Sequence, residues 1–147
     1  MQGENYQVDM NPLASIPIAV SQDPTQFNAR HDRLCSLNTQ LKAESKKFDR
    51  IIGTVCKLNT LPRAASKWWA MDFKSFYAAI KVKLPLSDVA DLGEFFESQQ
   101  QIIRSIRAEI DSTEFELDEL VFNLYGLTAK ERQTVRAAVS SASELIL

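Results

Sequence analysis

Two stretches of the chain carry apolar residues at every seventh position, and this repeat limits the possible folds more than any other feature. A seven-residue repeat places these side chains on one stripe of an α-helix, where a second helix can cover them. The first stripe lies within residues 25–58 and the second within residues 87–125. Two such stripes in a single chain most simply predict two long helices that fold back on each other as an antiparallel hairpin.

Residues at the main position of each repeat are expected to form the shared seam of this hairpin. In the first helix they are Phe27, Leu34, Leu41, Phe48 and Val55. In the second helix they are Val89, Phe96, Ile103, Ile110, Leu117 and Leu124. A companion position three residues later adds Leu37, Ile51, Leu58, Leu92, Ile106 and Leu120. We therefore expect coiled-coil-like packing along the pair.

Local signals mark the ends of the long helices and predict two shorter ones. Asp23 followed by Pro24 is typical of a helix start. Gly126 is typical of the left-handed residue that ends a helix. A short helix is expected over about residues 72–81, between the long helices, and a capping box starts a terminal helix over about residues 129–142.

The sequence changes character at about residue 24. Residues 1–23 are an irregular lead-in, in which IPIAV (residues 16–20) is compatible with a short edge strand or a strand-like segment. Residues 24–147 make up the helical module. The predicted fold is all-α: a long-helix hairpin with a short helical insertion at its tip and a short C-terminal helix.

The chain offers few side chains for catalysis or for holding a metal or cofactor. His31 is its single histidine and Cys35 and Cys56 are its two cysteines, which do not make up a set of zinc ligands. Its four glycines form neither a phosphate-binding loop nor a dinucleotide-binding pattern. We expect no catalytic residue, no metal and no cofactor, with His31 a half-buried helix residue.

The cysteines and the hydropathy pattern predict the cellular location. Cys35 and Cys56 would lie on one helix, 21 residues or ~31 Å apart, which is too far for a disulfide. Two free thiols are typical of the reducing cytosol. No apolar run approaches the ~20 residues of a membrane span, and the N-terminus lacks a signal-peptide pattern. We expect a soluble, cytoplasmic protein with no membrane partner.

The segment between the long helices is basic and aromatic. Residues 57–83 hold six Lys or Arg and one acidic residue, a local charge of +5 in a chain of net charge −2. Basic side chains neutralise phosphates, and aromatic side chains stack on bases. The candidates for contact with DNA or a partner are Arg63, Lys67, Trp68, Trp69 and Lys74. Alternatively, the two tryptophans seal the hairpin tip and the lysines only solvate it.

A second basic group lies on the first long helix. Its members are Lys42, Lys46, Lys47 and Arg50. The spacing puts them on the outer side of that helix, away from the predicted seam. We expect this group to be a solvated face.

The end of the second long helix carries the most specific motif. Residues 109–132 read EIDSTEFELDELVFNLYGLTAKER, and the runs FDRII, TLPRAASKWWAMDFKSFYAAI and KLPLSDVADLGEFFE precede it. Over about residues 25–138, these runs resemble the C-terminal region of type IIG restriction–modification enzymes and related adenine-N6 DNA methyltransferases. In that family a pattern E-I-D-x-T-(D/E)-x-E-I-D-x-L-V-(Y/F)-x-L-Y-G-L-T-x-x-E closes the protein. Here Leu117 replaces the usual isoleucine.

The resemblance implies a helical spacer and target-recognition region that positions an enzyme on DNA. It does not imply catalysis, because the family's Asn/Asp-Pro-Pro-aromatic methylation motif is absent: Asn11-Pro12 is followed by Leu13. The glycine motif for S-adenosylmethionine and the nuclease motif are absent too. The implied partners are DNA, in the context of a larger enzyme, and a methyltransferase or nuclease domain in cis or in trans. Residues 1–23 would then be the tail of a preceding recognition domain.

A different class of function fits the same repeats. The chain would be a coiled-coil oligomerisation or adaptor module with no role on DNA. An unsatisfied stripe would pair two hairpins as a homo-oligomer, in a bundle of four helices. Duplex binding that depends on salt, and that is lost when Arg63 and Lys67 are replaced, distinguishes the first function from the second.

Overall fold

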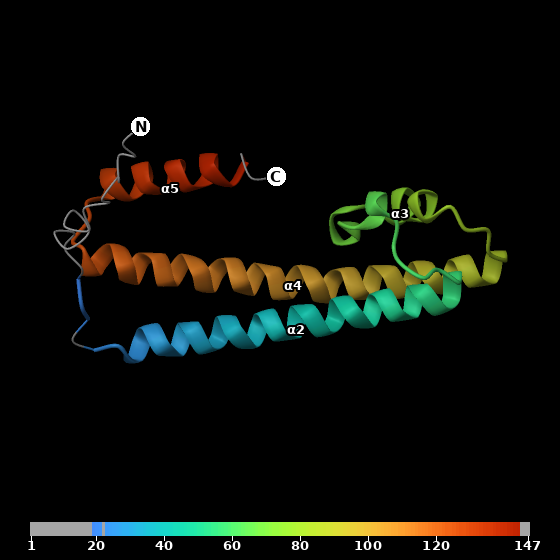
Figure 1. Ribbon diagram of the computed structural model, residues 1–147, viewed down its shortest axis with the longest axis horizontal. Helices are drawn as coiled ribbons and strands as arrows, with labels where there is room; N and C mark the ends of the chain where they lie inside the picture. The colour runs from blue at the N-terminus through green and yellow to red at the C-terminus, as the bar shows by residue number, and fades with distance from the viewer. Residues whose placement is uncertain (1–18, 22, 145–147) are drawn as a thin grey trace, which may run out of the picture. The chain divides into compact units, whose positions relative to one another are not determined.

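A computed structural model of the chain describes residues 19–21 and 23–144, and these residues form helices and connecting turns without a strand. The four α-helices of this part are α2 (Thr25–Cys56), α3 (Phe73–Ile80), α4 (Leu86–Leu124) and α5 (Ala129–Glu144). Two short 3-10 helices, η1 (Arg63–Ala65) and η2 (Trp68–Ala70), precede α3 (Figure 1). The all-α prediction with two long helices is confirmed. The strand-like segment expected at residues 16–20 lies mostly outside the described residues.

The chain divides into two compact units, each with its own packing. The first unit, Thr25–Glu119, contains α2, the insertion of residues 57–85 and most of α4. The second unit holds the described residues up to Pro24 and those from Leu120 onward, including α5.

Within the first unit, α2 and α4 lie side by side as a long helix pair (Figure 1). Leu37 of α2 packs with Ile106 and Ile110 of α4. Further along α2, the ring of Phe48 meets that of Phe96 edge-on, with ring centroids 6.3 Å apart. Residues early in α2 therefore contact residues late in α4, and residues late in α2 contact residues early in α4.

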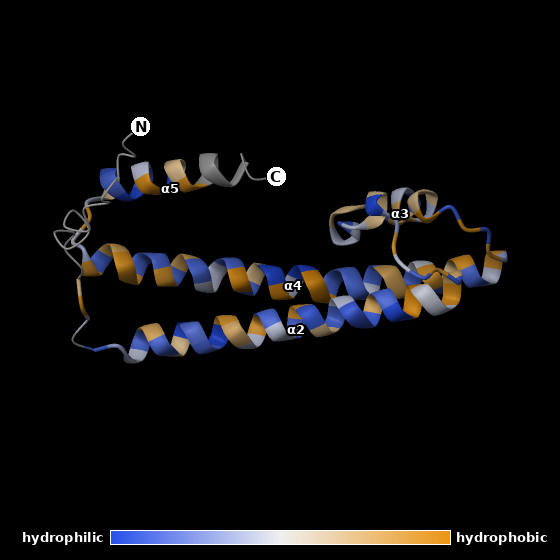
Figure 2. Ribbon diagram, viewed as in Figure 1, coloured by the Kyte–Doolittle hydropathy of each residue, from blue (hydrophilic) through white to orange (hydrophobic). Residues whose placement is uncertain are grey.

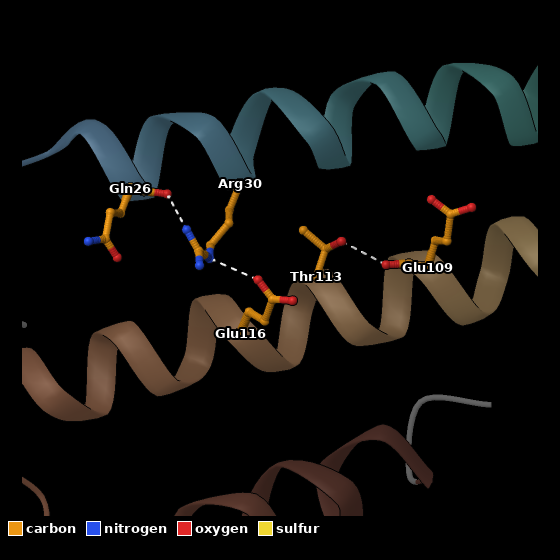
Figure 3. A network of polar contacts seen from close by, with 5 residues as sticks. All are labelled: Gln26, Arg30, Glu109, Thr113 and Glu116. Carbon is orange, nitrogen blue, oxygen red and sulfur yellow. Dashed lines mark hydrogen bonds and ion pairs between the residues drawn. The ribbon is translucent and has the colours of Figure 1, made fainter.

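Ion pairs join the two helices at the end of the pair that is remote from the insertion. The Arg30 guanidinium donates to the Gln26 carbonyl oxygen at 3.3 Å, and its Nε lies 3.1 Å from a carboxylate oxygen of Glu116 across the pair (Figure 3). One turn further, Arg33 pairs with Glu109. These groups are all partly exposed, so each pair contributes little net stability, about 0.2–1 kcal/mol, and chiefly fixes which residues face each other.

The seven-residue repeat describes the buried positions of α4 better than those of α2. In the part of α4 that belongs to the first unit, the buried residues are Leu92, Phe96, Gln99, Ile103, Ile106 and Ile110, at alternating steps of four and three. In α2, the buried residues are Leu37, Phe48, Ile52 and Cys56. The last three follow the 3.6-residue period of a straight helix, which drifts ~20° per heptad away from a strict repeat.

Val55 shows the consequence of this drift, because it is 41% exposed although it occupies a main seam position. Its neighbours Ile52 and Cys56 are buried instead, since the insertion covers that side of α2. The other expected seam residues outside the buried set are half-buried: Phe27, Leu34, Leu41, Val89, Leu117 and Leu124. Apolar and polar residues accordingly alternate along both long helices in Figure 2.

The insertion packs on the helix pair through a cluster of aromatic rings. Trp68 stacks face to face on Phe48, with ring centroids 3.6 Å apart and planes 10° from parallel. Phe76 of α3 packs against Phe96 of α4 with centroids 4.8 Å apart. Each of these side chains is at most 2% exposed, and burying an aromatic residue of this size contributes ~1.5–3 kcal/mol. The core of the first unit is therefore concentrated at the insertion.

Two local devices shape the insertion. The chain leaves α2 through Lys57, at φ 53°, and the Leu58 amide then donates to the Gly53 carbonyl at 2.9 Å. A Cβ at Gly53 would lie 3.0 Å from the Leu58 carbonyl oxygen, so this close return favours glycine inside the helix. At the start of α3, the Asp72 carboxylate accepts a hydrogen bond from the Ser75 amide at 2.8 Å.

In the second unit, a glycine ends α4 and a capping box begins α5. Gly126 has φ 64°, and the Leu127 amide donates to the Phe122 carbonyl at 2.9 Å. The Glu131 carboxylate accepts from the Thr128 amide at 2.8 Å and from the Thr128 hydroxyl at 2.7 Å. These hydrogen bonds hold the pKa of Glu131 below its usual value.

Arg132 and Arg136 of α5 fasten that helix to the end of α4. Arg132 donates to the Asn123 side-chain oxygen at 2.8 Å and to the Leu127 carbonyl at 2.9 Å. The Arg136 guanidinium lies 5.2 Å from the ring centroid of Phe122, which is only 6% exposed. The last turn of α4 and the first turns of α5 therefore form one packed corner.

Because the buried side of α2 drifts away from the seven-residue repeat, we expect substitutions of Phe48 and Val55, which share a repeat position, to have different effects on stability. Phe48→Ala should lower the free energy of unfolding by about 3–5 kcal/mol, because the ring is fully buried against Trp68. Val55→Ala should change the free energy of unfolding of the single chain by about 0.5 kcal/mol or less, because the side chain is exposed there. Urea unfolding followed by circular dichroism measures both, and equal losses would instead indicate a strict heptad seam.

The capping box predicts an acid-sensitive start of α5. Because the folded-state pKa of Glu131 is lowered, its stabilising effect is complete above the usual glutamate pKa and is lost as the pH falls through the lower folded value. An NMR titration of the Thr128 amide should show an inflection below that of an unstructured glutamate. Glu131→Gln should abolish the inflection. An inflection at or above the usual glutamate value would contradict the capping interaction.

Candidate functional site

The structure separates the two adjacent tryptophans that the sequence grouped as contact candidates. Trp68 is 2% exposed and stacked on Phe48, so its ring is unavailable to a ligand while the core stays closed. Trp69 is half-buried and meets Trp68 edge-on, with ring centroids 6.2 Å apart. Of the two, only Trp69 presents part of its ring at the surface.

The three basic candidates are all exposed on the insertion. Arg63 lies in η1, Lys67 immediately precedes η2, and Lys74 lies in the first turn of α3. Asp72, the single acidic residue of this segment, is engaged as the cap of α3. Hydrogen bonds from Ser75 lower the pKa of Asp72 and favour its ionised form. This single negative charge leaves the insertion with a net positive charge.

Two arginines of α4 complete the surface around Trp69. The guanidinium carbon of Arg107 lies 4.2 Å from the ring centroid of Trp69, and Arg104 Nε donates to the Trp69 carbonyl at 3.0 Å. A cation over a tryptophan face contributes ~0.5–1 kcal/mol at an exposed site. We refer to Trp69, Arg104 and Arg107 as the Trp69 cluster.

Sequence reasoning missed both arginines of the Trp69 cluster, which lie 35 or more residues from Trp69. The sequence did contain one indication that these arginines share a helix face: the spacing is four and then three residues for Gln100, Arg104 and Arg107. In the structure, Gln100 Nε2 donates to the Met71 carbonyl at 2.6 Å, just after η2. Together with the contacts of Arg104 and Arg107 to Trp69, all three side chains of this stripe bind η2 or the residue that follows it. That stripe positions the insertion on α4.

The remaining side chains that could carry chemistry lie elsewhere in the first unit. The His31 Nε2 and Cys35 Sγ atoms lie 3.6 Å apart on the exposed side of α2. Within residues 19–21 and 23–144, no three His, Cys, Asp or Glu side chains are grouped to hold a metal ion. Burial raises the pKa of Asp49, which lines a pocket of about 160 Å³ beside the turn that follows α2.

Among the described helices, none has the length and apolar character needed to cross a bilayer. Cys56 is buried in the core and Cys35 is exposed, and both are free thiols. Burial raises the pKa of the Cys56 thiol.

The comparisons with known proteins bear on the family of the chain. No curated protein and no solved structure matches it. A family match covers residues 21–121, which include α2, the insertion and α4 almost to its end. The chain therefore belongs to the family described as "Domain of unknown function (DUF8810)".

Proposed function

We propose that this chain is a non-catalytic spacer and DNA-recognition-associated module of a restriction–modification enzyme. In this proposal the long helix pair is an antiparallel, coiled-coil-like hairpin. The insertion, which lies along the side of α4 rather than at the tip expected from the sequence, is its DNA-facing part. The motif of residues 109–132, with the runs that precede it, supports the link to restriction–modification enzymes. The proposal also places the protein in the cytoplasm, with a methyltransferase or nuclease domain in cis or in trans.

The observation that carries the proposal is a basic and aromatic surface fixed to a long helical support. Arg63, Lys67 and Lys74 are exposed on an insertion of local charge +5, and the Trp69 cluster adds two arginines from α4. Such side chains neutralise phosphates, and each contact releases condensed counterions from DNA. A net charge of −2 over the whole chain confines this attraction to the insertion.

The packing of the insertion supports a positioning role. Trp68 anchors the segment in the core, while Gln100 and Arg104 hold its backbone carbonyls. The phosphate-binding groups therefore start from a fixed geometry, which lowers the entropy lost on binding. With 39 residues, α4 spans ~58 Å, long enough to hold the insertion at a set distance from a domain at the other end.

Salt-dependent DNA binding tests this proposal. The isolated chain should bind duplex DNA at low salt, and Arg63→Ala combined with Lys67→Ala should weaken binding. The same double variant should reduce the slope of log K against log salt by about 1.8, because each lost phosphate contact contributes about 0.9. Fluorescence anisotropy with a labelled duplex, measured over a salt series, provides the affinity and the slope.

A matched control removes the same charge elsewhere. Lys42→Ala combined with Lys130→Ala replaces two exposed cations on α2 and α5, and should leave the slope unchanged. Equal weakening by the two double variants would mean that only net charge matters, which contradicts a defined DNA-binding surface. No binding even at low salt would contradict the DNA role and favour the oligomerisation or adaptor function.

A further inference from the structure

The long helix pair has an uncovered face on the side away from the insertion. A hollow of about 420 Å³ runs between α2 and α4 there, lined by Ile51, Val55, Asp88, Asp91, Leu92 and Phe95. A second hollow of about 430 Å³ lies further along the same helices and is lined by Gln40, Ala43, Glu44, Ile102, Ser105 and Ile106. We refer to the two hollows together as the open groove.

Helical geometry separates the open groove from the insertion. Residues two apart on an α-helix point in nearly opposite directions. Phe95 lines the groove, whereas Gly93 packs against the ring of Phe73 in the insertion. In the same way, Ile102 lines the groove and Arg104 holds the Trp69 carbonyl. The insertion therefore covers one side of α4 and leaves the groove side uncovered within the first unit.

The groove exposes large apolar side chains from both helices. Val55 is 41% exposed and Ile102 is 36% exposed, while Ile51 and Phe95 are half-buried. Apolar surface that is exposed in a row and bordered by charged residues is typical of a protein–protein contact. A partner that covers these side chains gains the free energy of their burial.

The two edges of the groove carry opposite charges. On α2, Lys46, Lys47 and Arg50 line a shallow hollow that shares Ala43 with the groove. On α4, the edge carries Asp88 and Asp91, both exposed. Lys47 is paired with Glu44 on its own helix, whereas Arg50 and Asp91 have no ion pair within the described part of the chain.

We propose that a second copy of this chain occupies the open groove, related to the first by a twofold axis that runs parallel to the long helices. In such an isologous contact each edge meets the other edge of the partner, so the basic edge of α2 faces the acidic edge of α4 twice. A ligand of a single charge sign is disfavoured, because DNA would be repelled by Asp88 and Asp91 and a basic helix by Lys46 and Arg50. The product is a bundle of four long helices with both insertions on its outside.

Charge exchange across the interface tests this proposal directly. Arg50→Glu alone and Asp91→Arg alone should each raise the dimer dissociation constant about tenfold or more, because like charges then face each other. The double variant, Arg50→Glu with Asp91→Arg, should restore the dimer, since the reversed charges are again complementary. Sedimentation equilibrium on the full chain measures the three constants.

A second pair of variants tests the apolar side chains of the groove. Val55→Lys should dissociate the dimer, whereas Leu86→Lys, which replaces a side chain that is 86% exposed and does not line the groove, should leave it intact. Circular dichroism of both variants verifies that the helices remain folded.

Three results would overturn the proposal. They are a wild-type chain that sediments as a monomer, a dimer that is insensitive to Val55→Lys, and two charge variants that fail to compensate each other. The proposal is independent of DNA binding, because Arg63→Ala with Lys67→Ala changes the insertion and should leave the dimer unaffected.

Discussion

The stacked contact between Phe48 and Trp68 fixes the insertion to the helix pair, because it brings together two rings that lie 20 residues apart in the chain. Phe48 belongs to α2 and Trp68 to the insertion, and both rings also approach Phe96 of α4. Fixing Trp68 in this position brings Trp69 to the surface of α4, within reach of Arg107. The geometry of the candidate DNA-binding surface therefore depends on a core interaction that does not itself contact a ligand.

The helix α4 contributes to both proposed interaction surfaces, the DNA-binding surface around the insertion and the open groove. One side of it holds the insertion through Gln100, Arg104 and Arg107, and the opposite side lines the open groove through Phe95 and Ile102. Its buried stripe at strict heptad spacing packs on α2 between these two sides. The three roles use different residues of a single helix. A DNA-facing surface and a self-association surface are accordingly compatible in one module.

Local patterns predicted much of the fold, and long-range contacts account for the rest. The long helices begin and end within two residues of the ranges expected from their repeats and caps, because those signals act over one or two turns. No local pattern predicts that Trp68 is buried and Trp69 half-buried. Trp68 is buried because it packs on Phe48 and Phe96, which are distant in the sequence. Arg104 and Arg107 were missed for the same reason: their role arises only once the insertion folds onto α4.

Native-state hydrogen exchange of Trp68→Ala tests most directly whether the aromatic core positions the insertion. Losing the stack should greatly accelerate exchange of the backbone amides in η2, α3 and the last two turns of α2, which the aromatic cluster covers. Amides near Leu37 and Ile106, in the middle of the pair, should keep their protection, because they belong to a separate cluster. If α3 and η2 exchange at the wild-type rate in Trp68→Ala, the insertion is held by other contacts and this account is wrong.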